Sequence, residues 1–154
     1  MHFMDLLKQF VLQQTQYSTL HAELNRVPAE NTEREAKVEF QLVPRKLKNP
    51  PDSGSPAYQV TAKLNCKGMD KQGEEPAFTV RIILEAVYLQ VSGDPVTFEV
   101  FSSRHGEFTR QLYPLLQQQL RQLLSQLGLE QLKLPVDMGT NVNPKQEIPA
   151  SQLH

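Results

Sequence analysis

The chain has 154 residues, of which 39% are hydrophobic and 21% charged, and it contains no tryptophan. This size and composition predict one globular domain with its own core and exclude a chain that is disordered throughout. Sixteen Lys and Arg residues against seventeen Asp and Glu residues give a net charge of -1, which provides no field to hold nucleic acid or an anionic membrane. The sole cysteine, Cys66, excludes an internal disulfide and favours a reducing compartment.

The N-terminal region predicts a short helix that runs into a first strand. Apolar residues between positions 3 and 11 have helical spacing, whereas residues 17–24 alternate between apolar and polar side chains. The first residues carry neither a basic segment nor a long apolar run, and no stretch approaches the ~20 apolar residues of a membrane span. We therefore expect a cytoplasmic protein.

Two segments with a period of two predict a pair of neighbouring strands. Residues 37–43 and residues 57–67 each alternate apolar with polar side chains, so that one face of each strand is dry and the other wet. The segment between them, residues 44–56, is rich in Pro, Ser and Gly and is expected to form a long loop.

Residues 78–91 predict a third strand that exceeds the usual length of about 3–10 residues. Its first face is apolar throughout, whereas the opposite face begins polar with Thr79 and Arg81. That opposite face then turns apolar at four positions, Ile83, Val87, Leu89 and Val91. Because so short a chain has few elements left to cover both faces, we expect the four side chains to form an oligomer interface or a binding surface.

A C-terminal helix is predicted over residues 111–127, with Pro114 admissible only in its first turn. Leucines at helical spacing form one apolar arc, opposite a face of Gln, Arg and Ser. Tyr113 and Leu124 lie at the edges of this arc, where we expect side chains to stay partly open. The preceding residues 96–103 fit either an alternating strand or a short helical crossover.

Side chains able to perform chemistry are few and scattered. No two of the four histidines have the spacing of a metal site; they are His2, His21, His105 and His154. Cys66 falls on the apolar face of its strand, which favours a buried structural thiol over a nucleophile. The glycines do not form a phosphate-binding loop. The sequence thus predicts no cofactor, no metal and no enzyme activity.

Two segments near the C-terminus follow one another in a characteristic order. Residues 112–114 read Leu-Tyr-Pro, and residues 129–137 read Leu-Glu-Gln-Leu-Lys-Leu-Pro-Val-Asp. This combination resembles the SecB protein-export chaperones, which have a Leu-Phe-Pro helix start and a later Leu-Asn-Leu-x-Pro-Val-Asn segment. Upstream, residues 85–88 resemble the family's Glu-Gly-Ile-Phe stretch, and residues 17–28 resemble its first strand.

The resemblance implies an α+β fold, in which helices pack on one face of a four-stranded antiparallel sheet. It implies a single domain over residues 1–138, followed by residues 139–154, which have no hydrophobic period and predict a mobile tail. Proteins of the family form a dimer of dimers, a tetramer in the bacterial cytoplasm, and hold unfolded polypeptides or preproteins in apolar grooves without ATP. We place the candidate client groove of this chain at four residues, Val87, Tyr88, Tyr113 and Leu124.

The sequence departs from the family at the sheet face where acidic residues dock the translocase motor SecA. Arg81 stands in place of one acid, Thr79 replaces its apolar companion, and Glu23 keeps an acid. Inverting a charge in a polar interface costs on the order of several kcal/mol, which argues against SecA as the partner. The alternative is an adaptor with the same fold that binds one dedicated partner, for example in a toxin-antitoxin system, without general chaperone activity.

Overall fold

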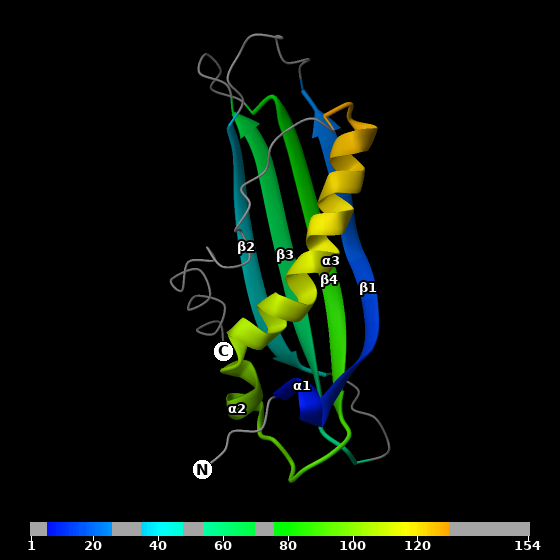
Figure 1. The fold of residues 1–154 in the computed structure, drawn as a ribbon, viewed down its shortest axis with the longest axis vertical. Coiled ribbons are helices and arrows are strands. Elements are labelled where there is room, and N and C mark those ends of the chain that lie inside the picture. The colour runs from blue at the N-terminus through cyan, green and yellow to red at the C-terminus, as the bar shows by residue number, and fades with distance from the viewer. Residues whose placement is uncertain (1–5, 26–34, 48–53, 70–75, 130–154) are drawn as a thin grey trace.

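The computed structural model describes residues 6–25, 35–47, 54–69 and 76–129. Its elements are α1 (Leu6–Gln9), β1 (Phe10–Leu24), β2 (Glu35–Lys46), β3 (Ala57–Met69), β4 (Phe78–Gln90), α2 (Phe98–Ser102) and α3 (His105–Gln126). The strands form one antiparallel sheet in the order β1-β4-β3-β2, and α3 crosses one face of it diagonally (Figure 1). This architecture confirms the predicted α+β fold and the pairing of the two strands expected over residues 37–43 and 57–67.

The core lies between the sheet and α3, on the face that we call the helix side. The helix-side residues of β4, taken in steps of two from Phe78 to Tyr88, are at most 1% exposed. They meet a stripe of α3 residues that recurs every fourth position and is fully buried, namely Phe108, Leu112, Leu116 and Leu120. Alternation in the strands and the 3.6-residue period in the helix thus bring the two apolar surfaces together.

Residues 96–103 form a helical crossover rather than a strand. Thr97 is the N-cap of α2, and its hydroxyl accepts a hydrogen bond of 3.4 Å from the backbone N–H of Val100. Phe101 of α2 is fully buried, and its ring lies 4.7 Å from the rings of both Tyr58 and Phe108. Burial of this one aromatic side chain explains why a short helix docks here.

Three predicted boundaries are wrong. The loop expected over residues 44–56 begins too early, because β2 continues to Lys46 and pairs with β3 over this length. α3 begins at His105 rather than at Gln111, because the apolar stripe continues back to Phe108. Pro114 therefore lies inside the helix, where its ring faces solvent and its missing N–H leaves the Arg110 carbonyl without its usual partner. β1 begins at Phe10 rather than near residue 17, since Phe10 is buried in the core and pairs with β4.

The remaining sequence predictions about the chain ends lie outside the described residues. These are the domain boundary at residue 138, the tail 139–154, and the segment 130–137 that contributes to the family resemblance. Among the helices that the structure describes, none is long and apolar enough to cross a membrane.

Candidate functional site

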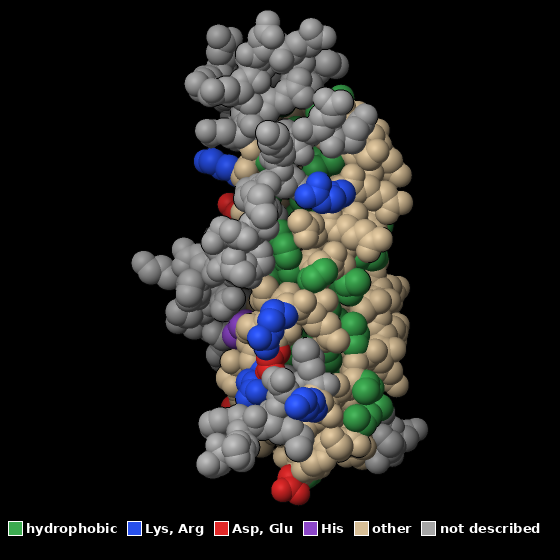
Figure 2. All heavy atoms as spheres, in the orientation of Figure 1, with side chains coloured by type: hydrophobic (Ala, Val, Ile, Leu, Met, Phe, Trp, Pro, Cys, Tyr) green, Lys and Arg blue, Asp and Glu red, His purple; other side chains and the backbone are tan. Residues whose placement is uncertain are grey.

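The helix side of β1 is far less covered than that of its neighbour β4. We call its apolar helix-side residues the β1 strip: Leu12, Tyr17, Leu20, Ala22 and Leu24. Leu20 is 49% exposed and Leu24 is 37% exposed, and the other three are half-buried. Figure 2 shows hydrophobic side chains at the surface of this face, alongside α3. The strip is therefore an apolar surface beside the core rather than part of it.

Backbone groups are also available next to this strip. β1 is an outermost strand of the sheet and pairs with β4 alone among the described strands, so its other edge has no strand partner there. A second polypeptide in extended conformation can pair with such an edge and place every second side chain on the strip. Tyr17 lies on the side of the strip that faces α3, because its hydroxyl donates a hydrogen bond of 3.2 Å to the Leu115 carbonyl of α3.

The opposite face of the sheet, which we call the outer face, is apolar at one end. Val11 is 44% exposed, Val91 is 55% exposed, and Leu89 between them is half-buried. A shallow cavity of about 550 Å³ adjoins this end and is lined by Pro56, Leu89, Val91 and Pro95 among others. The predicted interface positions Val87, Leu89 and Val91 thus do lie on the outer face near this end.

The expectation that another subunit has to cover Ile83 is wrong. Ile83 is only 9% exposed in the single chain, so no second subunit is needed to cover it. Its register partners on the outer face, Thr19 of β1 and Lys63 of β3, are both half-buried and flank it. Lysine stems commonly cover apolar surface in this way. The argument for association therefore rests on Val91 and Val11 instead.

The four residues predicted to line a client groove do not form one wall in this chain. Val87 lies on the outer face, whereas Tyr88, Tyr113 and Leu124 lie on the helix side, because successive strand residues point to opposite faces. The expectation that Tyr113 and Leu124 stay partly open is also wrong, since they are 6% and 2% exposed. The assignment of these four residues as client contacts stays a prediction.

The two tyrosines among these four residues are buried in the core. The Tyr88 hydroxyl donates a hydrogen bond of 2.7 Å to the Gln111 side chain of α3, and burial raises the pKa of Tyr88 well above its ordinary value. Tyr113 packs edge-on against Phe40 at a centroid distance of 5.2 Å, and burial raises its pKa to about 12. Both are therefore neutral packing residues.

Sequence reasoning missed a polar network at the middle of the outer face. The Glu85 carboxylate accepts hydrogen bonds from Thr61 at 2.5 Å, from Gln59 at 2.9 Å and from Ser18 at 3.0 Å. Partial burial acts to raise the pKa of Glu85, but these three bonds and the charge of Arg45 outweigh it and lower the pKa below its ordinary value. The network ties β1, β3 and β4 together, and its only sequence signal is one acid within an apolar strand.

The three residues predicted to dock a partner share the outer face beyond this network. Glu23 is the register partner of Thr79, and His21 is the register partner of Arg81. The Glu23 carboxylate lies 3.4 Å from the His21 imidazole. The structure thus brings the predicted docking residues together, while their role stays a prediction.

Two possible sources of chemistry, a reactive thiol and a cluster of metal ligands, are not found among the described residues. Cys66 is fully buried, and burial raises the pKa of its thiol to about 12, so the thiolate nucleophile is suppressed. The described residues contain no group of three or more potential metal ligands.

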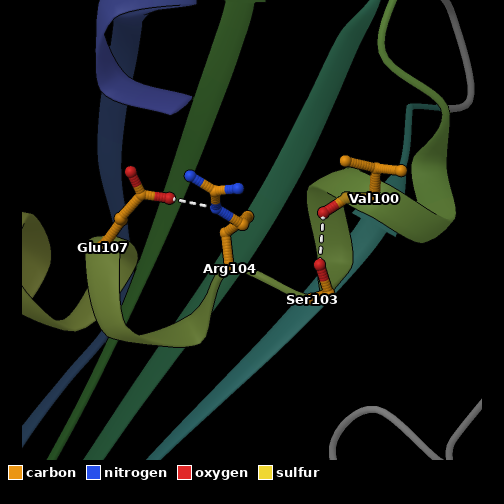
Figure 3. Close-up of polar contacts among 4 residues, drawn as sticks. All are labelled: Val100, Ser103, Arg104 and Glu107. Atoms are coloured by element: carbon orange, nitrogen blue, oxygen red, sulfur yellow. Dashed lines mark hydrogen bonds and ion pairs between the residues drawn. The ribbon is translucent and has the colours of Figure 1, made fainter. Parts of the chain in front are cut away.

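At the junction of α2 and α3, Arg104 donates a hydrogen bond of 2.5 Å to Glu107, and the Ser103 hydroxyl donates one to the Val100 carbonyl (Figure 3). The first contact lies at the start of α3, and the second closes the end of α2.

The comparison with solved structures finds a similar fold in a SecB-like chaperone. The chain is similar to the SecB-like chaperone Rv1957 of Mycobacterium tuberculosis, solved in complex with a ChAD peptide from the HigA1 antitoxin Rv1956. The TM-score is 0.63 at 18% sequence identity, over 85% of this chain and 93% of that chain. No family model and no curated protein matches the sequence. The sequence resemblance is thus confirmed at the level of the fold.

Proposed function

We propose that this chain is an ATP-independent chaperone that holds unfolded polypeptides on the β1 strip. The observation that supports the proposal is the exposure of Leu20 and Leu24 on the helix side of an edge strand. An extended client would pair its backbone with the open edge of β1 and bury alternate apolar side chains on the strip. Binding of this kind needs no nucleotide, because a partner of higher affinity can remove the client.

The energetics fit transient holding rather than permanent capture. Burial of apolar surface contributes roughly 25 cal/mol per Å², and much of this gain is offset by the entropy that an unfolded client loses on ordering. A strip of five apolar residues is therefore expected to bind unfolded chains weakly and with little sequence preference. Preproteins in a bacterial cytoplasm are suitable clients because they stay unfolded until export.

A matched pair of variants tests this placement. Leu20 and Val100 are equally exposed at 49%, but Val100 lies on α2, outside the β1 strip. We expect Leu20→Glu to weaken binding of a labelled unfolded polypeptide by about tenfold or more, and Val100→Glu to leave it unchanged. Fluorescence anisotropy measures the affinity, and a light-scattering assay measures suppression of aggregation. Equal effects of the two variants on affinity would show that clients do not bind at the strip.

A dedicated adaptor is the second candidate function. The structurally similar mycobacterial protein was solved with a peptide from an antitoxin, which supports the proposal that this chain, too, binds a protein partner. A general chaperone should prevent aggregation of several unrelated denatured proteins at stoichiometric concentration. An adaptor should fail with all of them and bind only its own partner, so the same aggregation assay separates the two functions.

We also propose that the protein assembles into a homo-oligomer, in keeping with the tetramer implied by the resemblance. The apolar end of the outer face, with Val11, Leu89 and Val91, is one surface that a second copy could cover. Val91→Asp should then shift the mass measured by multi-angle light scattering toward the 17.6 kDa of one chain. A wild-type protein of that mass at micromolar concentration would contradict the proposal.

A further inference from the structure

Four cations gather on the outer face at the end of the sheet opposite its apolar end. They come from three adjacent strands: Lys37 of β2, Lys63 and Lys67 of β3, and Arg81 of β4. Lys37 is the register partner of Lys67, so these two side chains stand directly opposite each other on one face. Arg81 lies diagonally from both Lys63 and Lys67, at a separation of ~7–8 Å in an antiparallel sheet. Three of the four are exposed and Lys63 is half-buried.

Nothing within the described residues neutralises this group. Among the side chains that the structure describes, the carboxylates on this part of the face are Glu23 and Glu39, so four cations lie beside two described acids. Neither acid forms an ion pair with any of the four cations, and Glu23 is engaged with His21 instead. Like charges directly opposite in a sheet are destabilising, so the arrangement of Lys37 and Lys67 lowers the stability of the isolated chain.

We propose that this basic part of the outer face docks an acidic segment of a protein partner. Carboxylates at alternate positions of an extended segment would lie between the cations and relieve their repulsion, which is unfavourable only in the unbound chain. The basic surface and the β1 strip lie on opposite faces of the sheet, so an acidic partner and an apolar client can be bound together. This proposal is independent of client binding at the strip.

The charge pattern favours a polypeptide over a nucleic acid. Glu23 and Glu39 alternate with the cations, and a phosphate backbone, which carries negative charge at every unit, would meet both of them. A polypeptide segment with a few acids can instead avoid these two positions. The whole chain has a net charge of -1 and adds no attraction for a polyanion of any length.

The repulsion between Lys37 and Lys67 gives the proposal a distinctive test. Lys67→Glu would create an opposite-charge pair with Lys37, so it should leave the free energy of unfolding unchanged or raise it, while it weakens docking. The probe is a short fluorescent peptide rich in glutamate, with a neutral glutamine-rich peptide as reference. We expect Lys67→Glu and Arg81→Glu each to lower the affinity for the acidic peptide about tenfold, with an effect that shrinks at high salt.

Control variants make the outcomes distinguishable. Arg121→Glu reverses an exposed cation on α3, and Leu20→Glu alters the β1 strip; both should bind the acidic peptide like the wild type. Equal affinity of the wild type for acidic and neutral peptides would overturn the proposal. So would a lower stability of Lys67→Glu, which would make the cations structural, or tighter binding of single-stranded DNA through Lys67 and Arg81.

Discussion

β4 and β1 run side by side and pair residue by residue, yet they relate to the core in opposite ways. Ile82 of β4 is fully buried, while its register partner Leu20 of β1, on the same face, is 49% exposed. Both are large aliphatic residues at equivalent positions of an alternating pattern. The difference arises because α3 crosses the sheet diagonally, so that it buries Ile82 on the central strand but leaves Leu20 on the edge strand uncovered (Figure 1). An apolar residue on the inner face of a sheet is thus a core residue only where a second layer covers it.

The largest expected effect is a direct test of this difference. Ile82→Ala should lower the free energy of unfolding by about 2–5 kcal/mol, because it leaves a cavity in a fully buried site. Leu20→Ala should lower it by less than about 1 kcal/mol, since half of that side chain already faces water. Urea unfolding followed by circular dichroism measures both values. Equal losses would mean that the β1 strip is covered, for example by a second subunit.

The second largest expected effect is a loss of about 1–3 kcal/mol in the free energy of unfolding, at a close contact between β3 and β4. The ring of Phe78 lies over Gly68, its register partner, and a Cβ at Gly68 would overlap that ring. Gly68→Ala should therefore destabilise the protein, and the double variant with Phe78→Leu should recover part of the loss. Gly106→Ala, where a Cβ meets no atom within 4 Å, is the matched control and should be neutral or slightly stabilising. Thermal unfolding provides the comparison.

Smaller effects, near 1 kcal/mol, should distinguish three tyrosines at the contact between the sheet and α3. Tyr88→Phe removes a buried hydrogen bond to Gln111 and should cost about 0.5–1.5 kcal/mol. Tyr17→Phe removes a longer and less buried bond and should cost less. The hydroxyl of Tyr113 is buried without a hydrogen-bond partner among the described residues, so Tyr113→Phe should be neutral or stabilising. Urea denaturation would contradict this ranking if Tyr113→Phe were the most harmful of the three.

The smallest effect concerns pH and the Glu85 network that joins β1 to β4. Because the folded-state pKa of Glu85 lies below its ordinary value of 4.5, the stabilising contribution is complete above that value and is lost as the pH falls through the folded-state pKa. Glu85→Gln should therefore lose stability at neutral pH and approach the wild type as the pH falls below the folded-state pKa of Glu85. Solvent screening keeps the difference below about 1 kcal/mol. Glu99→Gln, on the exposed side of α2, should show no such convergence.

The sequence predicted the central strands well and the edges of the fold poorly. The strands β2, β3 and β4 were identifiable because burial of one face imposes strict alternation, as at Phe40 and Leu64. The first half of β1 was missed because residues 13–16 are polar and exposed on both faces, so an edge strand leaves no period there. The start of α3 was missed because Pro114 usually marks a first turn, whereas here it lies on the solvent side and is tolerated.

The candidate site was less predictable than the fold. The Glu85 network depends on Ser18, Gln59 and Thr61, which come from different strands, and only the sheet register brings them within hydrogen-bond distance. The openness of Leu20 and the closure of Tyr113 depend on where α3 lies across the sheet, and no local pattern encodes that path. Sequence periodicity identifies faces, but the layer that covers a face is a property of the whole chain.

The strand order β1-β4-β3-β2 also has a consequence for how the chain folds. Among the described strands, β2, β3 and β4 follow one another and can form an antiparallel meander from local contacts, while β1 precedes all three and pairs only with β4. Closing that long loop makes β1 the last strand to join and, with its thin cover, the first to leave. We therefore expect β1 to be the strand most able to exchange between two copies of the chain.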